Sequence, residues 1–372
     1  MGLPATTPAQ GARNLLANCA KAREGDRLLI AYEPPEFGFY DGEAVGCVIA
    51  AAEELGIHID TVNVGFTPET PHLTPDLMAL FEAADIILFL ARLGDQLRFS
   101  DMPPGKKIIV SFAVTQELFG SGFATGHHDA FTALKTRIND VLASAENVQV
   151  TCAAGTDFTG RPAMDLSAKG DTSVLRFPMS VFTPVPAHSF SGRVALAGFL
   201  TGTGSRYYPN YTIEFERPLA ALFDQGRLTG FDGSREDVRR ANQHYDYVSD
   251  LFGIDRNFVH SWHAGIHPGC GYPWDMRQNM ERWGGAAFGN PRILHFHTCG
   301  AYAPGEISWN MIDPTITIDG VPVWENGVLH IDRLPGGPEI IAPYPCARAL
   351  FASPDPNIGF RHAVSAPSAL PL

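Results

Sequence analysis

The first 147 residues alternate between segments with helically spaced apolar side chains and short, nearly continuous apolar runs. The helical spacing predicts helices over residues 8–23, 41–55, 75–84 and 131–145. The apolar runs predict strands over residues 27–32, 59–64, 85–91 and 107–114. Because strands buried on both faces have few polar positions, this alternation indicates an α/β domain of flavodoxin type, with helices covering a parallel sheet.

The pattern changes beyond residue 147. Short alternating segments separated by Gly, Pro, Asp and Ser predict strands over residues 148–151, 173–177, 192–200 and 210–216, interrupted by a helix over 235–251. We therefore expect an α/β fold in which a parallel-sheet domain (1–147) is followed by a mostly antiparallel α+β domain (148–352). Residues 353–372 are rich in Pro and Ser, which predicts a surface tail.

One predicted hairpin carries candidate chemistry. Its strands are residues 291–297 and 306–312, joined by a glycine and proline turn over 300–305. Side chains alternate along a strand, so His295 and His297 face one side, and Glu306 on the returning strand can reach them. Two imidazoles and one carboxylate on one surface match the composition of a facial-triad metal site.

Histidines and tryptophans are concentrated in this region. Six of the thirteen histidines lie between residues 244 and 297. Any single one is readily explained as a packed, hydrogen-bonded side chain, but the set favours a metal centre, since imidazole is the commonest transition-metal ligand. All five tryptophans lie beyond residue 261, and either a wall for an aromatic substrate or a hydrophobic core explains them equally well.

Composition narrows the partners. A net charge of −13 disfavours binding to nucleic acid. The loop at 33–40 has no phosphate-binding glycine pattern. Six scattered cysteines predict reduced thiols and a cytoplasmic protein, and we expect no membrane span and no signal peptide. Only 18% of residues are charged, against about 25% in typical domains, which favours a homodimer or larger homo-oligomer.

Three segments together resemble the aminopeptidase T family of metallopeptidases, in particular its shorter branch that includes 2,5-dihydroxypyridine 5,6-dioxygenase. They are residues 24–30 (EGDRLLI), 150–159 (VTCAAGTDFT) and 315–323 (TITIDGVPV). The resemblance covers most of the chain.

The resemblance also implies ligands. His263, in the segment HAGIHP, stands where the family has a ligand before its "GIG-x-N-P" turn, and His295 matches the family's strand histidine. The final H-x-D signature is absent, since its positions read Ser308-Trp309-Asn310. We therefore expect either a relocated metal site at His263, His295, His297 and Glu306 or a relative that binds no metal.

The leading expectation is a mononuclear metal-dependent enzyme, with Fe²⁺ favoured over Zn²⁺ or another divalent ion. We expect this enzyme to resemble a non-haem ring-cleaving dioxygenase that acts on a small hydroxylated aromatic or N-heteroaromatic compound. In this hypothesis Asn310, Ser308 and Thr298 contact substrate or oxygen, and Asp313 is a candidate acid or base. The alternatives are a metal-dependent hydrolase with Glu306 as general base, and a metal-free binding relative.

Overall fold

The structure is a computed structural model that describes residues 6–69, 73–98, 100, 102–162, 174–202, 205–300 and 303–360. Its first sheet has five parallel strands in the order β2-β1-β3-β4-β7. These strands are β1 (Arg27–Tyr32), β2 (His58–Asn63), β3 (Ile86–Leu90), β4 (Lys107–Ser111) and β7 (Leu175–Phe177). The predicted N-terminal parallel sheet is therefore confirmed.

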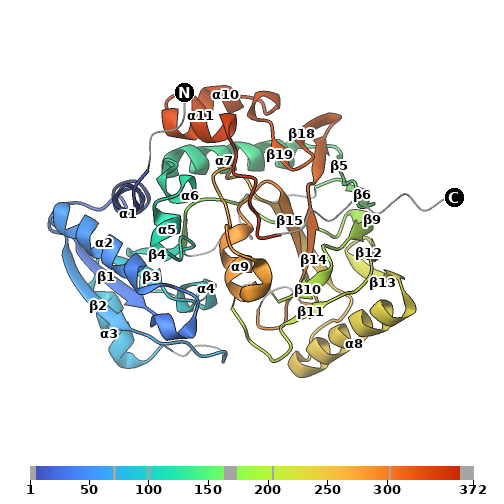
Figure 1. Ribbon diagram of the computed structural model, residues 1–372, viewed down its shortest axis with the longest axis horizontal. Coiled ribbons are helices and arrows are strands. Elements are labelled where there is room, and N and C mark those ends of the chain that lie inside the picture. The colour runs from blue at the N-terminus through green and yellow to red at the C-terminus, as the bar shows by residue number, and fades with distance from the viewer. Residues whose placement is uncertain are drawn as a thin grey trace.

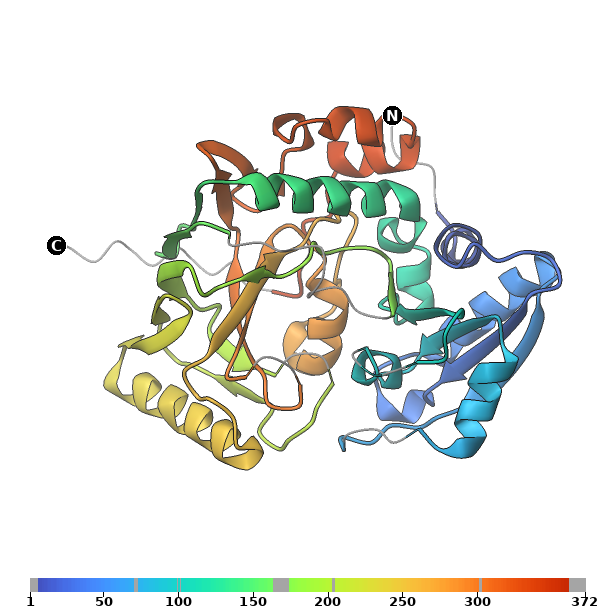
Figure 2. The ribbon, with the colours of Figure 1, turned by 180° about the vertical axis from the view of Figure 1, so that it is seen from behind.

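Helices cover both faces of this sheet, which forms one end of the molecule (Figures 1 and 2). Alternate residues of β1 belong to different hydrophobic cores: Leu28 packs in a core with Val48 of α2, and Leu29 in a core with Phe81 of α3. The helices and helical turns are α1 (Pro8–Arg13), η1 (Asn14–Cys19), η2 (Pro35–Phe37), α2 (Gly42–Glu54), α3 (Pro75–Ala83), α4 (Leu93–Gln96), α5 (Gln116–Phe119), α6 (Gly122–Thr125) and α7 (His128–Ser144).

Strand β7 differs from the prediction. Residues 173–177 were expected in the antiparallel region, but β7 pairs in parallel with β4, with Arg176 opposite Val110. A three-residue strand carries too little pattern to distinguish an edge strand of one sheet from a strand of another. The domain boundary between residues 147 and 148 stays a prediction. Strand β7 follows that boundary in sequence, yet it forms the last strand of the first sheet.

The rest of the chain forms two antiparallel sheets, as predicted. The six-stranded sheet has the order β11-β10-β16-β15-β14-β8. Its strands are β8 (Val185–Pro186), β10 (Phe199–Thr201), β11 (Thr212–Glu214), β14 (Val259–Ala264), β15 (Ile293–Thr298) and β16 (Ile307–Ile312).

The eight-stranded sheet has the order β13-β12-β9-β6-β5-β17-β18-β19. Its strands are β5 (Val148–Thr151), β6 (Asp157–Gly160), β9 (Phe190–Ala195), β12 (Leu219–Asp224), β13 (Arg227–Gly233), β17 (Thr315–Ile318), β18 (Val321–Glu325) and β19 (Val328–Leu329). The helices and turns of this part are α8 (Arg235–Phe252), η3 (Met276–Gln278), α9 (Met280–Ala287), η4 (Ile331–Arg333), α10 (Gly337–Ile341) and α11 (Pro345–Ala352).

Aromatic side chains fill the core between these sheets. Trp262, Trp309 and Trp324 are fully buried there, and Trp283 is fully buried in the core that α9 shares with the first sheet. Four of the five tryptophans are thus core residues. For those four, the hydrophobic core explains the tryptophans, and not a wall for an aromatic substrate.

The C-terminal stretch is only partly described. Residues 361–372 of the predicted surface tail lie outside the described residues. Within 353–360, Ile358 is buried and its carbonyl oxygen accepts a hydrogen bond from Trp283 Nε1 at 2.8 Å. This stretch therefore packs against helix α9, which carries Trp283.

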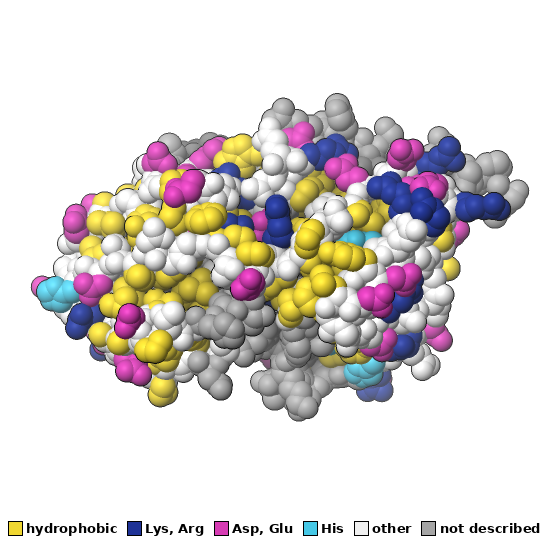
Figure 3. All heavy atoms as spheres, turned by 90° about the horizontal axis from the view of Figure 1, so that it is seen from below, with side chains coloured by type: hydrophobic (Ala, Val, Ile, Leu, Met, Phe, Trp, Pro, Cys, Tyr) yellow, Lys and Arg dark blue, Asp and Glu magenta, His cyan; other side chains and the backbone are white. Residues whose placement is uncertain are grey.

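The surface adds two observations. Among the described residues, no helix has the length and apolar character needed to cross a bilayer. On the face seen from below, hydrophobic side chains gather across the middle, and charged side chains of both signs lie mostly around them, with several basic ones together at one side (Figure 3). No continuous basic surface of the kind that follows a phosphate backbone is visible on that face.

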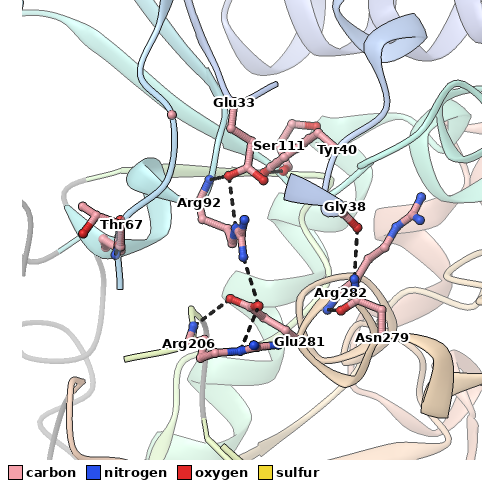
Figure 4. Close-up of polar contacts among 12 residues, drawn as sticks. Glu33, Gly38, Tyr40, Thr67, Arg92, Ser111, Arg206, Asn279, Glu281 and Arg282 are labelled. Atoms are coloured by element: carbon pink, nitrogen blue, oxygen red, sulfur yellow. Dashed lines mark hydrogen bonds and ion pairs between the residues drawn. The ribbon is translucent and has the colours of Figure 1, made fainter. Parts of the chain in front are cut away.

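A buried ion-pair cluster joins the two parts (Figure 4). Arg92 follows β3, and its guanidinium lies between Glu33, which follows β1, and Glu281 of α9. The two nitrogen–oxygen distances are 3.1 and 3.0 Å, and all three side chains are at most 6% exposed. Glu281 also accepts a bond from the backbone N–H of Arg206 at 2.7 Å. This cluster fixes α9 to the carboxyl ends of β1 and β3 in the parallel sheet.

Candidate metal centre

Three adjacent strands of the six-stranded sheet bring the predicted residues together. His263 of β14 pairs with His295 of β15, which in turn pairs with Asn310 of β16. Two residues along β15, His297 pairs with Ser308. Directly opposed residues in antiparallel strands point to the same face, so the three imidazoles, the amide and the hydroxyl share one surface.

The imidazole nitrogens converge. Nε2 of His263 lies 2.6 Å from Nε2 of His295 and 3.2 Å from Nε2 of His297. One ligand atom from each histidine lies within 4.8 Å of the other two, so the three side chains could hold a metal ion. Nitrogens bound about 2.1 Å from a common ion are themselves separated by about 3 Å. The spacing therefore suits a single ion.

The partners of the other ring nitrogens fix two tautomers. Nδ1 of His263 donates to the carbonyl oxygen of Phe182 at 3.1 Å, and Nδ1 of His297 donates to a carboxylate oxygen of Glu306 at 2.8 Å. Neutral imidazole carries one N–H, so Nε2 of His263 presents a lone pair, and Nε2 of His297 does the same when that ring is neutral. With both rings neutral, these lone pairs lie 3.2 Å apart and repel each other. A cation between them removes that repulsion, which is the fit that a metal ion requires.

Burial favours the neutral form of His263 and His295. Desolvation, reinforced by the neighbouring His297, lowers the pKa of His263 well below its usual value. Desolvation also lowers the pKa of His295, with further contributions from the other two histidines and Arg176. Neutral imidazole is the form that binds a metal.

Glu306 was predicted as a ligand, and the structure places it behind His297. Its Oε1 accepts from Nδ1, the ring nitrogen directed away from the other two histidines. Its Oε2 lies 3.7 Å from Nη2 of Arg98, which also pairs with Asp95 at 2.8 Å. Burial alone would lower the pKa of Arg98, but the two carboxylates outweigh it and the pKa is raised. In this arrangement Glu306 orients a ligand histidine.

Ser308 and Asn310 lie beside the histidines, each paired across the sheet with one of them. Both side chains are completely buried. The Ser308 hydroxyl and both polar atoms of the Asn310 amide have no hydrogen-bond partner among the described residues. Buried polar groups are normally paired, so these atoms are available for a bound molecule on the histidine face.

Thr298 and Asp313 lie elsewhere. Thr298 follows His297 and therefore points to the opposite face, where its hydroxyl contacts Tyr245 and donates to the carbonyl of Ile307. Asp313 lies beyond the end of β16, and both carboxylate oxygens are bound to Arg292 at 2.6 and 2.8 Å. The structure does not bring these two side chains to the histidine face.

Other histidines of the sequence cluster fill packing roles. His267 is buried with its ring stacked on Phe131, at a centroid distance of 3.7 Å. His244 is buried on α8 beside Tyr208. The simple packing explanation therefore holds for these two.

Several residues of the centre gave no sequence signal. The ring of Phe288 lies 4.1 Å from that of His295, and the ring of Phe182 stands edge-on to His263 at 6.3 Å. Arg98 and Arg176 bring positive charge to the same region. These side chains come from separate segments, and only the fold places them beside the histidines.

Comparison with known proteins supports the fold. No family model matches the sequence, and no curated protein matches it. Among solved structures, 2,5-dihydroxypyridine dioxygenase from Pseudomonas putida KT2440 is similar with a TM-score of 0.57 at 14% identity, covering 87% of this chain and 96% of that chain. The aminopeptidase AmpT from Thermus thermophilus has a TM-score of 0.49 at 11% identity, covering 86% and 98%.

The first of these structures belongs to the branch that the sequence motifs resemble. At 14% identity the likeness concerns the fold.

Proposed function

We propose that this chain is a mononuclear metal-dependent enzyme. In this proposal it is a non-haem Fe²⁺ dioxygenase-like protein acting on a small hydroxylated aromatic or N-heteroaromatic compound. The carrying observation is the convergence of three Nε2 atoms, with that of His263 lying 2.6 Å from His295 Nε2 and 3.2 Å from His297 Nε2. Imidazole donors suit Fe²⁺ as well as Zn²⁺.

His263, His295 and His297 would hold the ion. The carbonyl of Phe182 and the carboxylate of Glu306 fix two of these rings through their Nδ1 atoms, and such partners commonly raise metal affinity. When bound, iron supplies the one-electron chemistry that dioxygen needs in order to react with an aromatic ring.

The remaining residues of the face would bind substrate. Phe288, whose ring lies 4.1 Å from that of His295, offers a flat surface for an aromatic ring. Asn310 can donate and accept, and Ser308 can donate, to hydroxyl or ring-nitrogen groups. These two residues keep the polar role that the sequence analysis also gave to Thr298.

A metal-dependent hydrolase is the second candidate, because three imidazoles are also a donor set for catalytic Zn²⁺. That reaction needs a general base beside the metal-bound water. Glu306, the residue proposed for it, is engaged by His297 and faces Arg98. This placement favours the dioxygenase-like reaction.

The test is elemental analysis of anaerobically purified protein, followed by oxygen-uptake assays. We expect about one metal ion per chain and oxygen consumption with hydroxypyridines or hydroxybenzoates. Turnover of aminoacyl anilides without oxygen consumption would support the hydrolase instead. Protein that retains no stoichiometric metal would contradict both and point to a metal-free binding relative.

A further inference from the structure

Arg176 is a half-buried cation without a carboxylate partner among the described residues. It lies on β7, and its guanidinium carbon is 3.9 Å from the centroid of the Phe112 ring. Stacking on an aromatic face leaves the in-plane N–H donors of a guanidinium directed outward. The arginine is therefore held in place while its donors remain available.

Two less exposed arginines near the same strands, Arg92 and Arg98, are compensated. Arg92 is paired with Glu33 and Glu281, and Arg98 with Asp95 and Glu306. For Arg176, burial lowers the pKa to about 10, and the charge of Asp95 offsets only part of that effect. A buried charge without a partner is unfavourable, so an anion from outside the chain would stabilise this position.

Arg176 shares its surroundings with the candidate metal centre. Its guanidinium lies within electrostatic range of both His263 and His295. The chain runs from β7 to Phe182 within six residues, and the carbonyl of Phe182 accepts the His263 Nδ1–H bond. One short segment thus carries both the cation and the carbonyl that orients a histidine.

We propose that Arg176 binds the carboxylate of an aromatic or N-heteroaromatic acid, with the ring of that acid against the histidine face and Phe288. This inference rests on the proposed function of the site and narrows its substrate class. A guanidinium fork matches the two oxygens of a carboxylate. One uncompensated positive charge matches a monoanion, and a phosphate dianion would require a second.

The test compares acids with their isosteric neutral amides. Benzoate and benzamide, 3-hydroxybenzoate and 3-hydroxybenzamide, and nicotinate and nicotinamide form matched pairs. Each is titrated calorimetrically into the full chain, both metal-free and loaded with Zn²⁺, which binds imidazole without turning over oxygen. We expect the wild-type protein to bind at least one acid about 10- to 100-fold more tightly than its amide.

Variants assign that preference to Arg176. Arg176→Gln should remove it with metal content unchanged, and Arg176→Lys should restore part of it, because a point charge replaces the fork. Arg333→Gln is the matched control, since Arg333 is also half-buried but is paired with Glu325 at 2.9 Å. It should retain the full preference.

The outcomes separate the two proposals. Equal affinity for acid and amide, binding of neither class across the panel, or a preference that survives in Arg176→Gln would overturn the role of Arg176. Failure of the wild-type protein to hold metal would instead contradict the proposed function, and the titrations on metal-free protein still decide the role of Arg176.

Discussion

At the scale of single residues, the arrangement of hydrogen bonds around three histidines says more than their number. His263 and His297 each use Nδ1 as a donor to a fixed oxygen, and this turns each Nε2 toward the other two rings, where a neutral imidazole presents a lone pair. A packed histidine such as His267 shows no such convergence and stacks on Phe131. The difference distinguishes a candidate ligand from a structural imidazole.

Replacing His297 with alanine should abolish metal retention, because it removes one of three converging donors and leaves the Glu306 carboxylate without its imidazole partner. Metal per chain is measured by elemental analysis after anaerobic purification. His188→Ala is the control, since His188 is exposed and outside the cluster. Metal content equal to that of the wild-type protein would refute this assignment.

Glu306→Gln should weaken metal binding about tenfold or more while keeping the stoichiometry at saturating metal. The amide oxygen can still accept from His297 Nδ1, but the negative charge that increases the basicity of the ring is lost. Competition with a chromogenic chelator measures the affinity. Glu325→Gln is the control, because Glu325 lies 3.8 Å from His330 outside the centre. An unchanged affinity in Glu306→Gln would contradict an orienting role.

At the scale of elements, helix α8 shows how amphipathic patterning and burial set pH dependence. The helix begins at a Ser234 cap and ends at Gly253, which has a left-handed backbone (φ 63°). Its buried face includes Ala241, His244 and Val248. Burial lowers the pKa of His244 to about 4, and Nε2 has no hydrogen-bond partner among the described residues.

A lowered histidine pKa stabilises the fold above the unfolded-state value of about 6.5. That contribution is lost as pH falls toward the folded value of about 4, because the unfolded chain takes up the proton first. The free energy of unfolding of the wild-type protein should therefore fall between pH 7 and pH 5. In His244→Phe that fall should be smaller by about 1–2 kcal/mol.

Urea unfolding at the two pH values measures the difference. His188→Gln, at an exposed position, should keep the pH dependence of the wild-type protein. An unaltered pH dependence in His244→Phe would show that His244 does not contribute.

At the scale of the whole molecule, the Glu33–Arg92–Glu281 cluster connects the parallel sheet to α9 (Figure 4). Phe288, which follows α9, is the aromatic side chain beside His295. The cluster therefore couples the position of the first sheet to the wall of the candidate site.

Arg92→Met should destabilise the protein by about 3–5 kcal/mol, because two buried carboxylates lose their shared partner. Arg27→Met is the control: the Arg27–Asp60 pair is more than half exposed, and its loss should cost about 1 kcal/mol or less. Urea unfolding at pH 7.5 compares the two variants. Equal losses would contradict the assignment.

The same variant should show a distinctive pH dependence. Desolvation already raises the pKa of Glu33 in the wild-type protein, although Arg92 opposes this effect. A raised carboxyl pKa means that stability falls as pH rises through the folded value, since the folded state holds the proton more tightly. Without Arg92 the effect grows, so the destabilisation should be smaller at pH 5 than at pH 7.5.

Local patterns were sufficient for most of the fold. Buried parallel strands are nearly all apolar, and β1 was predicted to the residue, because hydrophobic periodicity is a property of neighbouring residues. The common face of His295 and His297 also follows from strand alternation alone. What the sequence did not contain was the partner of β7, a three-residue edge strand.

Tertiary structure decided which side chains surround the three histidines. It placed Glu306 behind His297, and it brought Arg98, Arg176 and Phe288 close to the centre. Except for the contact between His297 and Glu306 within one hairpin, these contacts join residues far apart in the chain, and no local pattern encodes which of them meet. The sequence by itself determined which residue types were available and which side of a strand they occupy. Packing of the two parts against each other determined which of them share one environment.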